Sequence, residues 1–165
     1  MIKAVGLKVF YSYLDKPEYR SAVFEIAKDP AIKVIHLNRR NALDEFISLQ
    51  KATLSGTWSQ TRKTQPATQQ QYTLDPADFL HFLKLRTFLK RRTRYIFQDQ
   101  DFHEISYEDL LTDREKTLLE VQRFLGVKPK KLFSLLVRQG DPSHTDITNY
   151  EVLREVYDDF LKANE

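Results

Sequence analysis

The spacing of apolar residues along the chain changes several times, and each spacing predicts a strand or a helix. Short runs of β-branched and aromatic residues predict strands, whereas apolar residues spaced three and four apart predict helices. The predicted strands cover residues 5–13, 33–38 and 102–107. The predicted helices cover residues 17–28, 41–54, 75–97, 113–125, 129–137 and 149–163. Strands that alternate with helices indicate an α/β fold, in which helices cover a parallel sheet.

Several of these helices have residues at their ends that favour a start or a stop. Pro17 opens the first helix, because its fixed φ suits the first turn. Gly56 and Gly126 each follow a predicted helix and can adopt the left-handed conformation that ends one. Residues 57–74 are polar, and a long excursion is expected there. The length of 165 residues fits one domain over residues 1–165 with a sizeable core.

The composition excludes several classes of function. The chain contains no cysteine, which rules out a disulfide framework, a cysteine-based zinc site and a cysteine nucleophile. The net charge of +3 is mild, and no nucleic-acid partner is expected, because such domains usually carry a stronger and clustered excess. No apolar run approaches the ~20 residues of a transmembrane helix. The first residues read as a strand rather than as a signal peptide, so a cytoplasmic location is expected.

A candidate site follows the predicted strand at residues 33–38. Arg39 and Arg40 come directly after this strand, and the next predicted helix begins at once. Anions settle at helix amino termini, and a guanidinium adds paired hydrogen bonds to a phosphate. Ser48 lies two helical turns beyond Asn41 on the same helix face, where its hydroxyl can donate to the same anion. The junction therefore predicts an anion site.

A second interpretation of this junction stays open. Asp44 and Glu45 lie in the first turn of the same helix, and they can pair with the two arginines on a solvated surface. Spacing alone does not choose between the two interpretations. Because ligands of parallel sheets bind beyond the carboxyl ends of the strands, residues 107–109 and 138–140 also become candidates.

Around this junction the sequence resembles the sulfotransferases that use 3′-phosphoadenosine 5′-phosphosulfate (PAPS). In that family an Arg and, after seven intervening residues, a Ser grip the 3′-phosphate, and this pair falls on Arg40 and Ser48. The flanking text VIHLNRRNAL is most similar to bacterial members that modify nodulation factors and lipids. The resemblance implies transfer of a sulfuryl group to a hydroxyl of a sugar, a lipid or a small alcohol, without a metal. Trp58 and Tyr72 are aromatic candidates for the acceptor pocket.

A second segment extends the resemblance. The stretch YEDL at residues 107–110, followed by FLG at residues 124–126, is similar to a sulfotransferase segment whose Tyr packs near the adenine. That role falls on Tyr107. The alternative is a core aromatic residue at a strand end, with Glu108 and Asp109 capping the next helix.

A third segment matches an Arg-x-Gly loop that lies over the 3′-phosphate in this family. Its glycine permits a close approach of backbone to ligand. The resemblance thus implies that PAPS, or its product adenosine 3′,5′-bisphosphate (PAP), is the co-substrate. The residues implied to bind it are Arg40, Ser48, Tyr107, Arg138, Gln139 and Gly140.

The phosphosulfate loop of the family has no counterpart among the four glycines of this chain. Family members begin with a strand and a glycine-containing loop that cradles the 5′-phosphosulfate. The resemblance therefore implies a P-loop NTPase-like sulfotransferase fold that lacks this strand and loop, truncated at the amino-terminal side and carrying the 3′-phosphate-binding half. An upstream segment or a second chain would supply the loop.

A nucleotide kinase relative is a further alternative. It would need a Walker loop and magnesium ligands, and neither is visible in the sequence.

Residues 6–11 resemble the family strand that carries a functional lysine. Lys8 matches this lysine, which can stabilise charge on the transferring sulfuryl group. Phe10 stands where many animal members carry a catalytic histidine, and no base is assigned. His36 is expected in the core. Structural roles are expected for the remaining histidines, which are His81, His103 and His144.

The predicted helix at residues 75–97 carries six basic residues and no acidic one between positions 84 and 94. This run is the basis of an alternative function, a non-catalytic module that binds an anionic polymer or membrane. The other interpretation is a solvated face opposite an apolar one. The apolar face would consist of Phe82, Leu85, Leu89 and Ile96.

Overall fold

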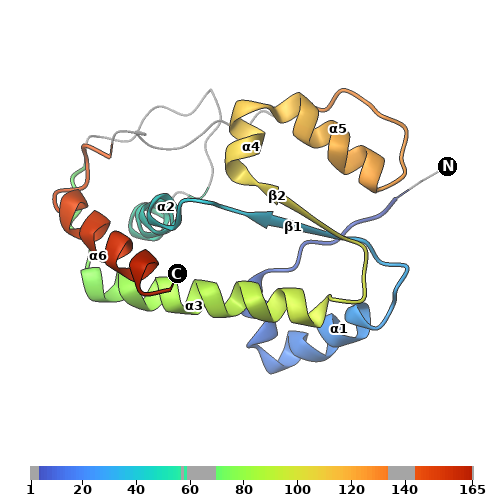
Figure 1. The fold of residues 1–165 in the computed structure, drawn as a ribbon, viewed down its shortest axis with the longest axis horizontal. Helices are drawn as coiled ribbons and strands as arrows, with labels where there is room; N and C mark the ends of the chain where they lie inside the picture. Colours follow the sequence, from blue (N-terminus) through green and yellow to red (C-terminus); the bar gives the residue numbers. More distant parts are fainter. Residues whose placement is uncertain (1–3, 57, 59–69, 134–143, 165) are drawn as a thin grey trace. The chain divides into compact units, whose positions relative to one another are not determined.

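The computed structural model describes residues 4–56, 58, 70–133 and 144–164 (Figure 1). Its elements, in chain order, are the 3₁₀ helix η1 (Tyr11–Leu14), α1 (Pro17–Ala27), β1 (Val34–Asn38), α2 (Ala42–Ser55), α3 (Pro76–Ile96), β2 (Phe102–Ser106), α4 (Tyr107–Thr112), α5 (Arg114–Phe124) and α6 (Tyr150–Lys162). The expected loop at residues 138–140 lies outside the described residues. The coarse prediction of a mixed α/β fold with a parallel sheet is confirmed.

The chain forms two compact units. Unit 1 consists of Met1–Arg40 and Thr87–Leu132, and unit 2 of Asn41–Arg86 and Phe133–Glu165. Helix α3 contributes its first part to unit 2 and its second part to unit 1. One boundary falls between Arg40 and Asn41, at the strand-to-helix junction singled out in the sequence. The expectation of one domain over residues 1–165 stays a prediction.

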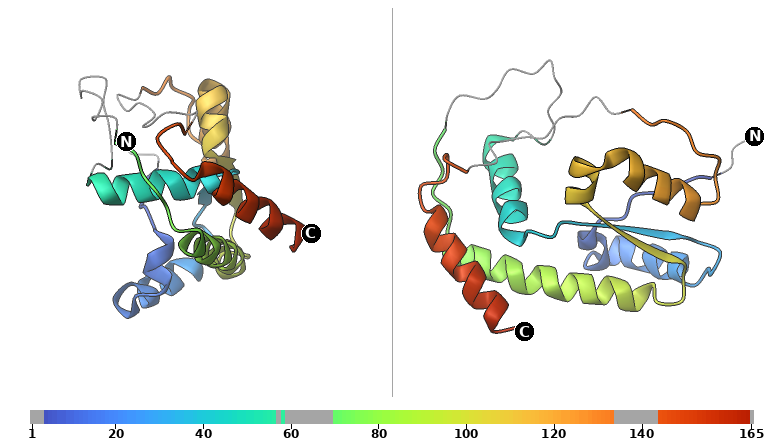
Figure 2. Two further views of the ribbon diagram at one scale, coloured as in Figure 1. Left: turned by 90° about the vertical axis from the view of Figure 1, so that its left-hand side faces the viewer. Right: turned by 45° about the horizontal axis from the view of Figure 1, so that its top comes forward.

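Unit 1 is built on the strands β1 and β2, which pair in parallel and can be followed in the right-hand view of Figure 2. Their register runs from Val34 opposite Phe102 to Asn38 opposite Ser106. A parallel pair requires a long crossover, and here the chain passes through α2 and α3 between the strands. The core of this unit gathers apolar side chains from η1, α1, the strands and the end of α3. Its buried members are Leu14, Val23 and Phe97.

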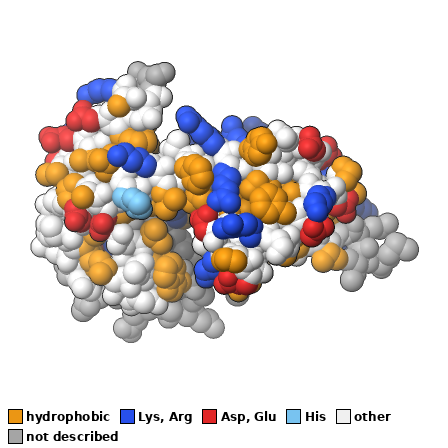
Figure 3. Space-filling model, turned by 90° about the horizontal axis from the view of Figure 1, so that it is seen from below, with side chains coloured by type: hydrophobic (Ala, Val, Ile, Leu, Met, Phe, Trp, Pro, Cys, Tyr) orange, Lys and Arg blue, Asp and Glu red, His pale blue; other side chains and the backbone are white. Residues whose placement is uncertain are grey.

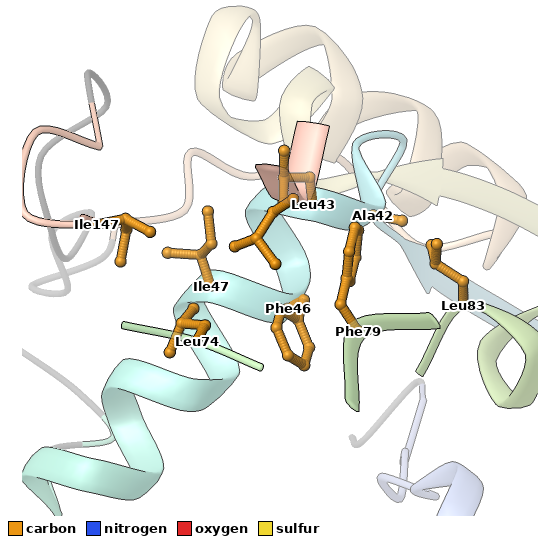
Figure 4. Close-up of a cluster of buried hydrophobic side chains, with 9 residues drawn as sticks. Ala42, Leu43, Phe46, Ile47, Leu74, Phe79, Leu83 and Ile147 are labelled. Atoms are coloured by element: carbon orange, nitrogen blue, oxygen red, sulfur yellow. The ribbon is translucent and has the colours of Figure 1, made fainter. Parts of the chain in front are cut away.

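Unit 2 has its own hydrophobic core, built mainly from α2, α3 and α6 (Figure 4). Leu43, Phe46 and Ile47 follow the helical spacing of three and four and line one face of α2. The Phe46 ring lies 4.9 Å from that of Phe79 on α3. Each such side chain contributes about 1.5–3 kcal/mol when it is removed from water.

A short connection orders the segment that precedes α6. Tyr72 and Ile147 form an isolated parallel bridge. The Asn149 side chain accepts a hydrogen bond from the Leu74 N–H at 3.1 Å and donates one to the Leu74 carbonyl at 2.7 Å. These contacts hold residues 144–149 against the start of α3 and within unit 2.

The helix ends agree with the cap residues of the sequence. Pro17 is the first residue of α1. The Asn41 side chain caps α2 by accepting hydrogen bonds from the N–H groups of Leu43 and Asp44. Gly56 ends α2 with a left-handed φ of 68°, and Gly126 has the same φ just after α5. These predictions are confirmed.

The predicted strand at residues 5–13 is wrong. Residues 4–10 have no regular secondary structure, and η1 occupies Tyr11–Leu14. A strand needs a neighbour to pair with, and in the described part of the chain the sheet consists of β1 and β2, which pair with each other. The apolar side chains of the segment therefore stay in solvent, with Val5 88% and Leu7 67% exposed.

Two further predictions need correction. Residues 129–133, the described part of the expected helix at 129–137, are not helical, and the Lys130 N–H donates to the side chain of Gln122 instead. Tyr107 is the first residue of α4 rather than the last of a strand. Ser106 takes over the cap of α4, because its hydroxyl accepts from the Asp109 N–H at 3.0 Å.

Candidate functional site

The carboxyl ends of β1 and β2 bring the first two candidate segments together in unit 1. Since Asn38 pairs with Ser106, the residues that follow each strand meet at one end of the sheet. The Arg39 guanidinium lies over the Tyr107 ring, 4.2 Å from its centroid. A cation in this position is attracted by the electron-rich face of the ring. Tyr107 is thus half-buried beside an arginine rather than enclosed in the core.

Arg40 contacts the first turn of α4 in two ways. Its backbone N–H donates to both carboxylate oxygens of Glu108, at 3.1 Å each. Its guanidinium donates a hydrogen bond to the Asp109 carboxylate. Hydrogen bonding by Ser106 and then by Arg40 lowers the pKa of Asp109, so this carboxyl is ionised at neutral pH. The Arg40 side chain nevertheless remains 65% exposed.

Three charged residues of this junction have partners within their own units. Arg40 pairs with Asp109, whereas Glu45 binds the guanidinium of Arg86 at 2.7 Å. Asp44 lies 2.9 Å from a ring nitrogen of His144. The arginine expected to hold a phosphate is therefore bound to the helix that follows the neighbouring strand.

In unit 2, the amino terminus of α2 has its backbone donors occupied by the protein itself. The N–H groups of Leu43 and Asp44 bind the Asn41 side chain, and the Ala42 N–H donates to the Tyr157 hydroxyl at 3.3 Å. Ser48 lies half-buried on the same helix. An anion at this end must therefore bind side chains and the helix dipole rather than unpaired N–H groups.

The model of the sulfotransferase family matches residues 17–130, which is well over half of the 165 residues. The chain belongs to the sulfotransferase family. Members of this family typically transfer a sulfuryl group from PAPS. The match includes Arg40, Ser48 and Tyr107, whereas Lys8 and residues 138–140 lie outside it. Comparison with curated proteins and with solved structures gave no match.

Sequence reasoning missed a group of polar side chains around His144 in unit 2. His144 Nε2 lies 2.9 Å from Asp44 Oδ1, and the imidazole stacks on the Tyr150 ring at 5.1 Å. Burial raises the pKa of the Tyr150 phenol, and the negative charge of Asp44 adds to this effect. Asp44 and His144 stand 100 positions apart, so no spacing rule pairs them.

A second histidine cluster lies in unit 1. His36 is buried, as expected, but it also has polar partners: the Tyr11 hydroxyl is 2.5 Å from its Nε2, and Glu104 is 3.5 Å from its Nδ1. Burial lowers the pKa of His36 and outweighs the opposing attraction of Glu104. Burial tends to raise the pKa of Glu104, but hydrogen bonding and charge from Arg94 lower it overall. The cluster is therefore a neutral imidazole beside an ionised carboxylate.

The basic run of α3 is largely engaged within the chain. Lys and Arg side chains appear in Figure 3 among hydrophobic and acidic ones. Four of the six basic residues have partners in their own unit: Arg86 with Glu45, Lys90 with the Arg39 carbonyl, Arg92 with Asp15, and Arg94 with Glu104. These side chains therefore have partners within the chain, and the alternative function, a module that binds an anionic polymer or membrane, stays a prediction.

The remaining candidates are Lys8 of unit 1 and the aromatic residues Trp58 and Tyr72 of unit 2. Lys8 is exposed, with its Nζ 4.4 Å from the centroid of the Phe10 ring. Trp58 is 66% exposed, and Tyr72 forms the bridge to Ile147.

Within the described ranges, no group of three or more His, Asp and Glu side chains could hold a metal ion. Among the same residues, no helix has the length and apolar character to span a bilayer.

Proposed function

We propose that this sulfotransferase binds the PAP portion of PAPS and takes part in sulfuryl transfer to a hydroxyl-bearing acceptor. The observation that supports this most is the meeting of Arg39 and Arg40 with Tyr107 and Asp109 at the carboxyl ends of two parallel strands, inside the family match. This is the end of a parallel sheet at which ligands bind.

Each proposed ligand residue has a chemical reason for its role. The Arg40 guanidinium has five donors, and the exposure of its side chain leaves room for an anion beside Asp109. Arg40 would bind the 3′-phosphate, and the Ser48 hydroxyl would donate to the same group. Tyr107 would offer its ring to the adenine. Arg138, Gln139 and Gly140 would cover the 3′-phosphate by resemblance.

The reactive end of the co-substrate needs further groups. PAPS supplies the sulfuryl group when it is bound: the acceptor oxygen forms a bond to sulfur, the bond from sulfur to PAP breaks, and PAP leaves. The hydroxyl proton passes to a base, a role to which no residue is assigned. Lys8 would stabilise the charge that develops on the transferred group. A glycine-containing loop for the 5′-phosphosulfate would come from an upstream segment or a second chain.

The acceptor class is a sugar, a lipid or a small alcohol, as in the bacterial members that the sequence resembles. Trp58, which is 66% exposed, would contribute to its pocket. Activity of the chain with and without added upstream sequence, measured as transfer of labelled sulfate from PAPS, tests whether an upstream segment supplies the loop. Equal activity of both forms contradicts supply by an upstream segment.

Titration calorimetry with PAP tests the binding proposal. Arg40→Ala should weaken the affinity about 10-fold or more, because a hydrogen bond to a charged group contributes roughly 1.5–3 kcal/mol. Arg91→Ala is the matched control, since Arg91 is an exposed arginine on α3. The absence of PAP binding at millimolar concentration, or equal affinities of the wild type and Arg40→Ala, contradicts the proposal.

A further inference from the structure

We infer that Tyr11, His36 and Glu104 form a proton-transfer unit, in which the Tyr11 hydroxyl takes the proton of the acceptor hydroxyl and passes its own proton to His36. The inference rests on the proposed function, and it supplies the base that this function lacks. The three residues, and the residues that hold them in place, all belong to unit 1.

The Glu104 carboxylate is held on β2, at the position opposite His36 in the parallel pair. It accepts hydrogen bonds from the Asn38 amide and from the Arg94 guanidinium. Burial tends to raise the pKa of Glu104, but Arg94 lowers it overall, so this carboxyl is ionised at neutral pH. Glu104 is therefore a fixed negative charge, 3.5 Å from Nδ1 of His36.

This charge determines which ring nitrogen of His36 carries the proton. Burial lowers the pKa of His36, so at pH 7 the imidazole is neutral, with one N–H and one lone pair. A lone pair on Nδ1 would face the carboxylate, and the stable tautomer therefore has its proton on Nδ1. Nδ1 has no hydrogen-bond partner within residues 4–56, 58, 70–133 and 144–164, and the gap to Glu104 closes readily once the imidazole becomes charged.

The Tyr11 hydroxyl donates to the other ring nitrogen of His36. Its oxygen lies 2.5 Å from Nε2, and the two rings meet edge to face with their centroids 5.9 Å apart. Because Nε2 carries a lone pair in this tautomer, the phenol is the donor. A phenol oxygen that donates its proton can accept one from another hydroxyl at the same time. Tyr11 is half-buried rather than enclosed, which suits a group that meets a substrate.

The unit adjoins the carboxyl ends of the two strands. Asn38, which binds Glu104, is the last residue of β1. Lys90 donates to the carbonyl of the following residue, Arg39, at 3.3 Å. The charge of the same lysine adds to the burial that lowers the pKa of His36. The imidazole is therefore within electrostatic range of the end of the sheet at which ligands bind.

The step that follows conserves every proton. The acceptor oxygen bonds to sulfur while the bond from sulfur to PAP breaks. The acceptor proton passes to the Tyr11 oxygen, the Tyr11 proton passes to Nε2 of His36, and Glu104 stabilises the imidazolium. A hydroxyl, a base and a carboxylate that orients the base are the arrangement by which enzymes commonly activate hydroxyl groups.

Labelling with benzenesulfonyl fluoride tests the unit without requiring sulfate transfer. The phenol oxygen bonds to the sulfur of this reagent, fluoride leaves, and the proton passes to the base. We expect Tyr11 to react about 10-fold or more faster than Tyr95, which is 72% exposed, when peptides are quantified by mass spectrometry. His36→Gln should abolish this advantage and leave the Tyr95 rate unchanged. His81→Gln, at an exposed histidine on α3, is the matched control.

The pH dependence of labelling gives a second measurement on the wild type alone. The charged and titratable groups that face His36 are Tyr11 of η1, Glu104 of β2, and Lys90 and Arg94 of α3. Since burial lowers the pKa of His36 from 6.5, the Tyr11 rate should be constant above about pH 6.5 and fall below it, as the imidazole is protonated. An ordinary phenol instead gains reactivity with pH up to about 10. That ordinary profile, or equal Tyr11 rates in the wild type and His36→Gln, overturns the inference and leaves the proposed function intact.

Transfer of labelled sulfate from PAPS tests the role in catalysis. Tyr11→Phe should lower the transfer rate about 100-fold at unchanged PAP affinity, and Tyr95→Phe should change neither. Equal transfer rates of the wild type and Tyr11→Phe overturn the inference. If the chain binds PAP without transferring sulfate, the labelling rates decide; if it neither binds PAP nor transfers sulfate, the proposed function is wrong and the inference with it.

Discussion

The guanidinium of Arg40 donates a hydrogen bond to the carboxylate of Asp109, one turn into the helix that follows β2. Both residues come from the carboxyl ends of paired parallel strands, although 69 positions separate them in the sequence. The pair fixes the guanidinium at the end of the sheet. It also means that a phosphate must share Arg40 with a carboxylate that is already ionised.

Removal of this competing charge should strengthen PAP binding. We predict that Asp109→Asn raises the affinity about 3–10-fold, because an ionised carboxylate next to the site repels the phosphate. Calorimetry with PAP checks the effect, and the gain should shrink at high salt, where charges are screened. Asp158→Asn removes an exposed carboxylate from α6 and should leave the affinity unchanged. A weaker affinity of Asp109→Asn would mean that Asp109 helps to hold the ligand.

The ring of Tyr107, rather than its hydroxyl, should matter for the nucleotide. Tyr107→Phe retains the face over which Arg39 lies, and we predict less than a twofold change in PAP affinity. Tyr107→Ala should weaken binding about 3–10-fold, since it removes both the stacking surface and the partner of Arg39. Equal affinities of the two variants would contradict a stacking role.

Buried His36 should make the stability depend on pH. Its pKa is lowered from the usual 6.5 by burial, so the unfolded chain binds a proton more readily than the folded one. Stability should therefore fall as the pH decreases from about 7 to about 5.5, within the range where an imidazole changes charge. Melting temperatures should show a shallower decline for His36→Gln than for the wild type and for His81→Gln. An equally steep decline in all three would assign the effect to other groups.

The core of unit 2 should depend strongly on Phe46. This side chain is 2% exposed and contacts Phe79, so Phe46→Ala should lower the free energy of unfolding by about 3–5 kcal/mol. Leu49→Ala on the same helix, at a side chain that is 41% exposed, should change it by less than about 1 kcal/mol. Urea denaturation measures both, and comparable losses would contradict the described packing of α2.

The sequence predicted those parts of the fold that local rules govern. Pro17, Asn41 and Gly56 act on their own helix ends, and apolar runs of helical period suffice to find α3 and α5. The expected strand at residues 5–13 failed because alternation shows which residues favour a strand but not whether a neighbour pairs with them.

The candidate site likewise contains some residues that local sequence patterns reveal and others that they do not. The order of the motifs drew attention to Arg40 and Tyr107, which sit at predicted element ends, and to Ser48, two helical turns beyond Asn41. The carboxylate that binds Arg40 and the pairing of His144 with Asp44 depend on contacts between distant segments. Such contacts follow from the fold and leave no local pattern in the sequence.

The central claim is that Arg40 binds the 3′-phosphate of PAP. The most direct test compares PAP with adenosine 5′-monophosphate, which lacks this phosphate, on the wild type and on Arg40→Ala by calorimetry. We predict that Arg40→Ala weakens PAP binding about 10-fold or more and leaves binding of the monophosphate nearly unchanged, because only the bisphosphate presents the group that Arg40 contacts. An equal loss of affinity for both nucleotides would contradict the claim.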